Sequence, residues 1–309
     1  MIHGYAIMRY GNEHFGRLET VLLHNPKDSL HRITKQNFKK YLFDELPNIK
    51  QFIKEHNQYR ELLKIHGVEV LELSDYVSDK TLLNNSPNMA YVHDVAVVTS
   101  KGAFISKMAF SGRKNEDRII KEAFERLGIP LCSERGKEEI FEGFLPYSKK
   151  LAILVETERY NVTGVHSFLK DALDVFDEIL YVKVPPNRIF MHYDMIIGRL
   201  KKDLVLCYPD AILKTELITK NERFEVDFMD FFSDKNIGMI PVSQEEQKRW
   251  ATSFVPLEPG LILNYDISLN KKTKKKLKDH DVEVISFSPK ALLSGSGSLN
   301  CLTLQIYRT

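Results

Sequence analysis

The sequence predicts a mixed α/β fold built from five repeated units with the order strand, strand, helix, strand. Three observations support this prediction. Short apolar stretches come in pairs around polar turns, a segment with helical spacing follows each pair, and a further apolar strand ends each group. Five such units can close into a ring, a five-bladed pseudo-symmetric α/β propeller, because closure removes exposed strand edges. We therefore expect residues 1–309 to form one domain.

The second unit is the clearest of the five. Apolar strands at 94–98 and 103–106 flank a polar turn. Residues 115–127 follow with apolar side chains at helical spacing, Gly128 ends this predicted helix, and 129–132 supplies the closing strand.

The same order of segments predicts the other four units. Their segments are 18–24, 47–65 and 68–73 in the first unit; 142–145, 151–155, 162–173 and 179–184 in the third; 194–197, 204–207 and 237–240 in the fourth; and 254–257, 261–263, 271–278 and 282–287 in the fifth.

Composition narrows the classes of function. The formal net charge is only +2, which argues against a protein that binds nucleic acid or a membrane surface. The basic run at 271–278 is read as a solvated helix face. The N-terminus has no signal core and no apolar run is long enough to span a bilayer. Three widely spaced cysteines predict neither disulfides nor a zinc site, so we expect a reducing, cytoplasmic location and no metal.

Groups with reactive side chains open several of the units. Asp94 opens the second, Glu142 the third, and His192 with Asp194 the fourth, while Cys301 follows a glycine-rich stretch near the end. A ring would bring these groups to one channel mouth. His192 and Asp194 are two residues apart, so on a strand both point the same way.

This set of groups suits a guanidinium substrate. Carboxylates accept its N–H groups in bidentate fashion, and three carboxylates around one point favour a cation between them. A thiolate is a strong nucleophile whose pKa is lowered by a nearby cation, and a histidine can protonate the departing amine and then activate water.

Several spaced motifs resemble the guanidine-modifying superfamily with the amidinotransferase fold, and arginine deiminase most of all. The resemblance covers nearly the whole chain. Its motifs are RLETVLLH at 17–24, LFDELP at 42–47, GVEVL at 67–71, PNMAYVHD at 87–94, FEG at 141–143, ER at 158–159, HYD at 192–194 and GSGSLNCLT at 295–303.

The resemblance implies a pentein fold and a role for each matching residue. Cys301 would attack the guanidinium carbon, and His192 would be first the general acid and then the general base. Asp94, Glu142 and Asp194 would hold the guanidinium nitrogens. Arg113 and Arg159 would bind the amino-acid carboxylate, and Asn88 resembles the substrate-binding asparagine of the family. No cofactor is implied.

The chain departs from the family pattern in two places. Phe144 and Leu145 stand where the family motif Glu-Gly-Gly-Asp has its second glycine and its aspartate. The extra helical domain of typical arginine deiminases is missing, because only residues 75–86 separate the first unit from the second. We therefore expect one catalytic domain without that insertion.

The resemblance implies hydrolysis of an arginine-like guanidino compound, with arginine giving citrulline and ammonia through a covalent intermediate on Cys301. Three alternatives stay open: an amidinotransferase that moves the amidino group to an acceptor amine, a dimethylarginine hydrolase, and a non-catalytic arginine-binding protein. The sequence leaves open whether the chain forms a homo-oligomer.

Overall fold

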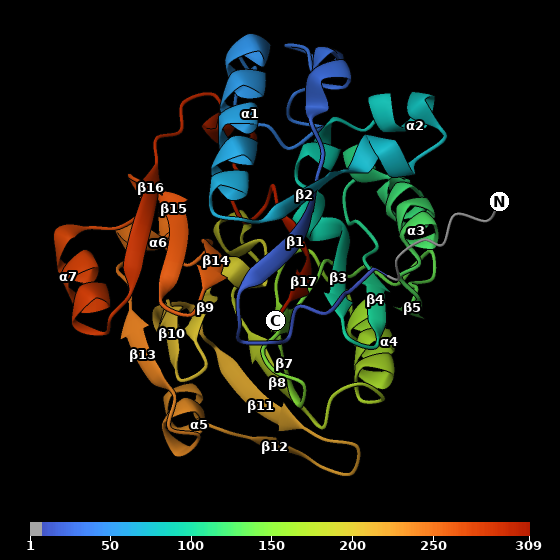
Figure 1. The fold of residues 1–309 in the computed structure, drawn as a ribbon. Coiled ribbons are helices and arrows are strands. Elements are labelled where there is room, and N and C mark those ends of the chain that lie inside the picture. The colour runs from blue at the N-terminus through green and yellow to red at the C-terminus, as the bar shows by residue number, and fades with distance from the viewer. Residues whose placement is uncertain (1–7) are drawn as a thin grey trace.

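The computed structural model describes residues 8–309, which form a mixed α/β structure with five sheets. Each sheet contains an antiparallel pair of strands that shares a strand with a parallel pair, and at least one helix lies between the two parallel strands in the chain; the third sheet has two further strands. In Figure 1, helices α1, α3, α4, α5 and α7 lie at the periphery, and strands β1, β3 and β17 lie nearer the middle. The predicted order of strand, strand, helix and strand is confirmed for these segments.

The first two sheets contain the N-terminal third of the chain and its last strand. The first has β17 (Leu304–Arg308), β1 (Leu18–Leu23) and β2 (Glu69–Glu72), with α1 (Ile49–Ile65) between β1 and β2. The second has β3 (Ala96–Thr99), β4 (Gly102–Ile105) and β5 (Leu131–Ser133), with α3 (Glu116–Leu127) before β5.

The other three sheets follow in chain order. The third has β6 (Leu145–Pro146), β7 (Leu151–Glu156), β8 (Glu178–Lys183), β11 (Lys214–Ile218) and β12 (Arg223–Glu225), with α4 (Val162–Ala172). The fourth has β9 (Ile197–Lys201), β10 (Leu204–Cys207) and β13 (Gly238–Pro241), with α5 (Phe228–Asp234). The fifth has β14 (Val255–Glu258), β15 (Leu261–Tyr265) and β16 (Glu283–Phe287), with α7 (Lys271–Asp279). Two short helices, α2 (Lys80–Asn84) and α6 (Gln244–Lys248), lie in connections.

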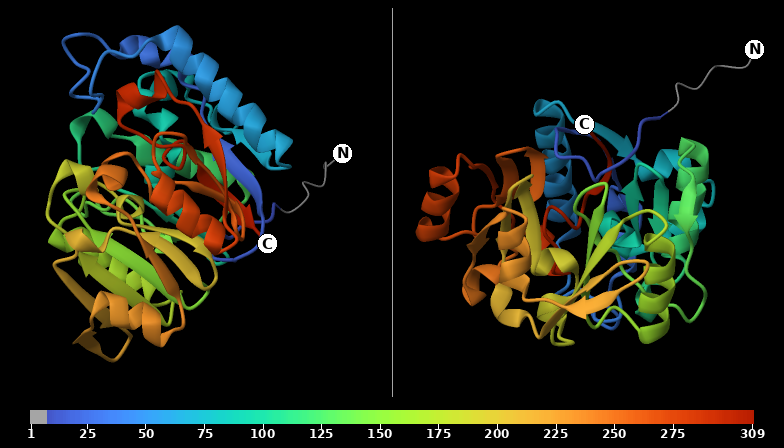
Figure 2. Two further views of the ribbon diagram at one scale, coloured as in Figure 1. Left: turned by 90° about the vertical axis from the view of Figure 1, so that its left-hand side faces the viewer. Right: turned by 90° about the horizontal axis from the view of Figure 1, so that it is seen from below.

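Two features of the sheets were absent from the sequence prediction. The opening strand of the first sheet comes from the far end of the chain, because β17 pairs antiparallel with β1. The hairpin of β11 and β12 lies between β10 and α5 in the chain, yet β11 pairs with β8 and extends the third sheet. Both views in Figure 2 place the C-terminal end beside the early β1 segment.

Helix α3 illustrates how the local sequence sets the ends of an element. Its buried face carries Ile119, Ile120 and Phe124 at helical spacing. The helix ends at Gly128, which has φ +70°, a left-handed conformation that glycine adopts without a steric penalty. The turn fixes where β5 begins and therefore how this last strand joins the second sheet.

None of the helices in residues 8–309 is long and apolar enough to cross a membrane.

Candidate active site

The predicted reactive side chains lie on short turns beside the opening strands of the sheets. Asp94 lies in the 3-10 helix Val92–Val95, directly before β3. Asp194 lies in the 3-10 helix Tyr193–Met195, directly before β9, and His192 caps that helix. Cys301 precedes β17, the opening strand of the first sheet. These candidate side chains therefore lie at equivalent ends of three sheets.

One buried cavity of about 30 Å³ collects most of these side chains. Six of the eight predicted site residues line it. They are Asn88, Asp94, Arg113, Arg159, His192 and Cys301. The remaining two, Glu142 and Asp194, contact lining residues from behind: Glu142 bonds His192, and Asp194 lies next to Cys301. The volume is about that of one water molecule, so this conformation is closed around the reactive groups.

His192 is held between two carboxylates. Its Nε2 lies 2.8 Å from Oε2 of Glu142, and its Nδ1 lies 3.5 Å from Oδ1 of Asp94. Burial acts to lower the pKa of His192, but the charge of Asp94 and the hydrogen bond with Glu142 outweigh it and raise the pKa above its ordinary value. The imidazole is therefore poised in its protonated form, as a general acid requires.

Glu142 is the acceptor that fixes this imidazole. Its Oε2 also accepts a hydrogen bond from Nη1 of Arg159 at 3.1 Å, and its Oε1 accepts the backbone N–H of Ala109 at 2.7 Å. Burial acts to raise the pKa of Glu142, but Arg159 and His192 bring it down to about 2. Glu142 is thus a permanent carboxylate, and in this conformation it faces His192 and Arg159.

Asp94 connects His192 to Arg113, which is in turn paired with Glu116. Its Oδ2 accepts a hydrogen bond from Nη1 of Arg113, whose Nε donates to Glu116 at 2.9 Å. Burial opposes ionisation of Asp94, yet His192 and Arg113 lower the pKa of the carboxyl below its ordinary value. Its Oδ1 is buried and makes no hydrogen bond with residues 8–309, and it lies 3.5 Å from Nδ1 of His192.

The surroundings of Cys301 disfavour its charged form, whereas those of His192 favour the charged form. Its Sγ is 3.4 Å from Oγ of Ser298 and 4.0 Å from Oδ2 of Asp194. Burial is the main cause that raises the pKa of the thiol, and the charges of Asp194 and Asp94 raise it further. These causes favour the thiol form of Cys301, and a further cation bound beside the sulfur would favour the thiolate.

Asp194 is positioned by its own hydrogen bonds. Its Oδ2 accepts hydrogen bonds from Oγ of Ser253 and, at 2.9 Å, from Nδ2 of Asn300. Its Oδ1 is buried and has no partner in the described part of the chain. The oxygen of Asp194 that lies 4.0 Å from Sγ of Cys301 is thus the one that Ser253 and Asn300 hold in place.

The glycine-rich approach to Cys301 has a steric cause. A Cβ atom on Gly295 would lie 1.7 Å from the hydroxyl oxygen of Tyr91, and one on Gly297 would lie 2.3 Å from its ring. The backbone of this loop packs directly on Tyr91, which lines the same cavity. Only glycine permits that approach, and it sets the position of Cys301.

The departure from the Glu-Gly-Gly-Asp motif is accommodated in the core. Phe144 is fully buried, with its ring 5.2 Å from that of Phe104 and 4.7 Å from that of Phe168. Leu145 begins β6 and pairs with Ile153. The loop is thus fixed by aromatic packing, while His192 keeps its two carboxylate partners.

Sequence reasoning missed four residues that line the cavity with polar or polarisable atoms. They are Tyr91, Arg188, Met191 and Ser296. Met191 directly precedes His192 and Arg188 lies four residues before it, and the other two belong to matched motifs. Proximity to these motifs was therefore the one sign in the sequence that these residues line the site.

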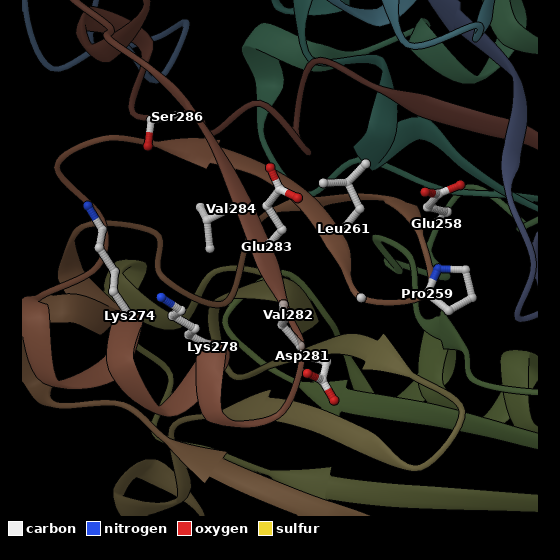
Figure 3. Close-up of a pocket in the computed structure, with 11 residues that line it drawn as sticks. Glu258, Pro259, Leu261, Lys274, Lys278, Asp281, Val282, Glu283, Val284 and Ser286 are labelled. Atoms are coloured by element: carbon white, nitrogen blue, oxygen red, sulfur yellow. The ribbon is translucent and has the colours of Figure 1, made fainter.

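A larger, open hollow lies elsewhere, between α7 and the strands β15 and β16 (Figure 3). Its volume is about 730 Å³, and Lys274 and Lys278 project from α7 along one side. It contains neither a cysteine nor a histidine, so nothing in it matches the chemistry gathered at Cys301. Among residues 8–309, no group of side chains has the arrangement needed to hold a metal ion.

Comparison with known proteins identifies the family of the chain. The family model "Arginine deiminase" matches residues 39–81 and 76–308. The arginine deiminase of Latilactobacillus sakei subsp. sakei strain 23K is 21% identical over 96% of this chain and 97% of its own length. That of Borrelia garinii subsp. bavariensis is 22% identical over 95% of this chain and 96% of its own length.

Solved structures show the same fold. The substrate-bound N-terminal domain of ArgZ, a cyanobacterial arginine dihydrolase, has a TM-score of 0.72 at 15% identity and covers 93% of this chain and 97% of that domain. A dimethylarginine dimethylaminohydrolase adduct has a TM-score of 0.66 at 15% identity, with 94% of this chain and 100% of the other covered. The mixed α/β fold is thus that of pentein structures, and the chain belongs to the arginine deiminase family.

Proposed function

We propose that this protein hydrolyses the guanidino group of arginine or a close analogue to a ureido product and ammonia. The observation that carries the proposal is that the Cys301 thiol and the His192 imidazole line one cavity together with the Asp94 carboxylate. Carboxylates that keep unused acceptors around a buried sulfur suit a planar cation. Membership of the arginine deiminase family supports arginine as the substrate.

Binding of the substrate favours the thiolate form of Cys301, which is the nucleophile. Burial, and after it the charges of Asp194 and Asp94, raise the pKa of the Cys301 thiol and favour its protonated form. A guanidinium between these carboxylates compensates both charges and favours the thiolate, so the nucleophile forms when the target carbon is beside it.

The first half-reaction forms a covalent intermediate. The Cys301 thiolate adds to the guanidinium carbon and gives a tetrahedral adduct. His192 donates its proton to one terminal nitrogen, the carbon–nitrogen bond breaks and ammonia leaves. A thiouronium on Cys301 remains. An ArgZ N-terminal domain has been solved covalently bound to a reaction intermediate, which supports this step by analogy.

The second half-reaction releases the product. His192, now neutral, takes a proton from water, and the resulting hydroxide adds to the same carbon. The carbon–sulfur bond breaks, the ureido product leaves and the sulfur departs as thiolate. Arginine and water thus give citrulline and ammonia. Glu142 and Asp94 keep the imidazole oriented throughout.

The residues proposed for substrate binding are those implied by the family motifs. Asp94, Glu142 and Asp194 are proposed for the guanidinium, Arg113 and Arg159 for the amino-acid carboxylate, and Asn88 as a further substrate-binding residue. In the closed conformation Arg159 is bonded to Glu142 and Arg113 to Asp94, so substrate binding requires these pairs to rearrange.

We infer that the whole chain is one catalytic domain, a five-bladed propeller without the helical insertion. Five sheets of matching strand order and the pairing of β17 with β1 support closure of a ring. The two matched stretches of the family model meet at residues 76–81, and alignments to the relatives run over 401 positions, more than the 309 residues here. Both facts support an insertion that this chain lacks at 75–86.

The proposed setting is reducing, as in the cytoplasm, because the chemistry needs a free thiol. All three cysteines are free in the structure. Association into a homo-oligomer remains a proposal that sedimentation of the purified protein would test.

Product analysis tests the proposed activity. Purified protein is incubated with L-arginine, with and without glycine as an acceptor amine, and the products are quantified by mass spectrometry beside Cys301→Ala and the buried control Cys207→Ala. Equimolar citrulline and ammonia without an acceptor, absent only in Cys301→Ala, support the proposal. Ornithine that forms only when the acceptor amine is present would establish amidinotransfer. Ornithine formed together with two equivalents of ammonia would establish a dihydrolase.

No turnover of arginine would refute the assignment of substrate. Turnover of a methylated arginine in its place would establish a dimethylarginine hydrolase. Saturable binding without turnover of either compound would establish a binding protein.

A further inference from the structure

Ser298 is a buried serine in direct contact with the sulfur of Cys301. Its side chain is fully buried and does not line the cavity. Its Oγ donates to Sγ of Cys301 at 3.4 Å and accepts the backbone N–H of Cys301 at 3.2 Å. In the described part of the chain, no other group donates a hydrogen bond to this sulfur. Because Ser298 lies outside the lining of the cavity, a substrate that fills the cavity leaves this contact in place.

A second buried serine connects Ser298 to Asp194. Oγ of Ser253 lies 2.5 Å from Oγ of Ser298 and donates to Oδ2 of Asp194. A hydroxyl carries one hydrogen and a carboxylate carries none. The hydrogen of Ser253 is therefore used at Asp194, so toward Ser298 the oxygen of Ser253 is only an acceptor.

The hydroxyl hydrogen of Ser298 consequently has two acceptors within reach. One is Oγ of Ser253 at 2.5 Å, and the other is Sγ of Cys301 at 3.4 Å. While Cys301 is a thiol, its S–H can point to Ser298 and Ser298 can donate to Ser253. When Cys301 is a thiolate, the sulfur becomes the stronger acceptor, because a hydrogen bond to a charged group is worth more than one to a neutral oxygen.

The sulfur gains charge twice in the proposed reaction. It is a thiolate before it attacks the carbon, it loses that charge when the carbon–sulfur bond forms, and it leaves as a thiolate when the bond breaks. Burial and the charges of Asp194 and Asp94 raise the pKa of the thiol, whereas the contacts with Ser298 lower it. A fixed donor beside a buried atom that gains charge stabilises the charged state without solvent reorganisation.

We propose that Ser298 is a further catalytic residue, whose hydroxyl hydrogen turns from Ser253 to the sulfur of Cys301 each time the sulfur becomes a thiolate. This inference rests on the proposed function, because it takes Cys301 as the nucleophile. Ser298 keeps its own proton throughout, so the proton balance of the two half-reactions is unchanged.

Alkylation of Cys301 by iodoacetamide without substrate reports the thiolate directly. Rates at fixed pH are compared for the wild type, Ser298→Ala, Ser298→Thr and Ser294→Ala, with peptide mapping of Cys301. Ser294 is the matched control, because it is buried in the same glycine-rich stretch and its hydroxyl donates to the carbonyl oxygen of Ala291 at 2.6 Å. Loss of the donor predicts about 10-fold slower alkylation for Ser298→Ala. Ser298→Thr, which keeps the hydroxyl, and Ser294→Ala should both react at close to the wild-type rate.

Three outcomes overturn the inference. Alkylation of Ser298→Ala at the wild-type rate or faster would mean that Ser298 only supports the backbone at Cys301. Equal slowing in Ser294→Ala, or in Ser298→Thr, would mean that displacement of the loop and not loss of the hydroxyl causes the change. Thermal unfolding of each variant checks that its fold is kept.

The covalent step supplies a second measurement. If the wild type converts arginine, formation of the thiouronium at saturating arginine should slow about 10-fold in Ser298→Ala while KM stays nearly constant. An unchanged rate of this step would also overturn the inference. If the wild type does not convert arginine, the proposed function fails, and the alkylation rates still decide the role of Ser298.

Discussion

Replacing Asp194 by asparagine should change two properties of Cys301 chemistry in opposite directions. Oδ2 of Asp194 lies 4.0 Å from Sγ, and after burial its charge is the next cause that raises the pKa of the thiol. Two unit charges at about 4 Å interact by about 4 kcal/mol at an effective dielectric constant of about 20, which corresponds to about 3 in pKa. Ser253 and Asn300 also bond this carboxylate and reduce its effect.

We therefore expect Asp194→Asn to lower the pKa of Cys301 by about 1 to 3. At a fixed pH below that pKa, each unit raises the thiolate fraction tenfold, so alkylation by iodoacetamide without substrate should become about 10 to 1,000 times faster. Arginine turnover should instead fall about 10- to 100-fold, because a carboxylate proposed for the guanidinium is lost.

The assay is the alkylation rate against pH, with peptide mapping to separate Cys301 from Cys132 and Cys207. Asp210→Asn, which changes an exposed aspartate, is the control for net charge. Alkylation that is unchanged or slower in Asp194→Asn would show that the carboxylate does not suppress the thiolate, and the idea that substrate activates the nucleophile would be rejected.

Three further substitutions test the packing and electrostatics around the site. His56 is fully buried, and burial lowers its pKa to about 4. Below about pH 6.5 the unfolded chain takes up a proton that the folded protein does not, so the free energy of unfolding falls as the pH drops from about 6.5 to 4. His56→Leu should therefore reduce the loss of stability between pH 7.5 and 5 by about 2 kcal/mol, measured by urea unfolding. A loss of equal size in the variant would contradict this. Gly164→Ala should destabilise by about 1–3 kcal/mol despite the better helix propensity of alanine, because its Cβ would lie 1.9 Å from the carbonyl oxygen of Ile140; a gain in thermal stability would contradict the packing. Phe144→Gly, which restores a family residue, should destabilise by about 3–5 kcal/mol because it empties the aromatic cluster, and unfolding at the wild-type midpoint would refute that.

The repeated units were predictable because their signals are local. Apolar spacing and turn residues predicted each helix and strand of the second unit to within a few residues, including the stop at Gly128. The pairing of β17 with β1 was not predictable in this way, because strands at opposite ends of the chain carry no local mark of their partner. The same holds for β11, which passes over its own unit to pair with β8.

The candidate site was predictable to the same extent. Cys301, His192 and Asp94 could be grouped because they occupy equivalent positions in the units, and the structure places them around one cavity. The orientation of Glu142 toward His192 and Arg159 depends on tertiary packing. Arg188 lies only four residues before His192, but that its side chain lines the same cavity depends on the fold.

The central claim is that Cys301 forms a covalent bond with the substrate carbon. Protein mixed with excess L-arginine and quenched in acid within the first turnovers should gain the mass of arginine less one ammonia, and peptide mapping should place this mass on Cys301. A protein that converts arginine to citrulline while every time point shows the unmodified mass, or while Cys301→Ala retains full activity, would contradict the account.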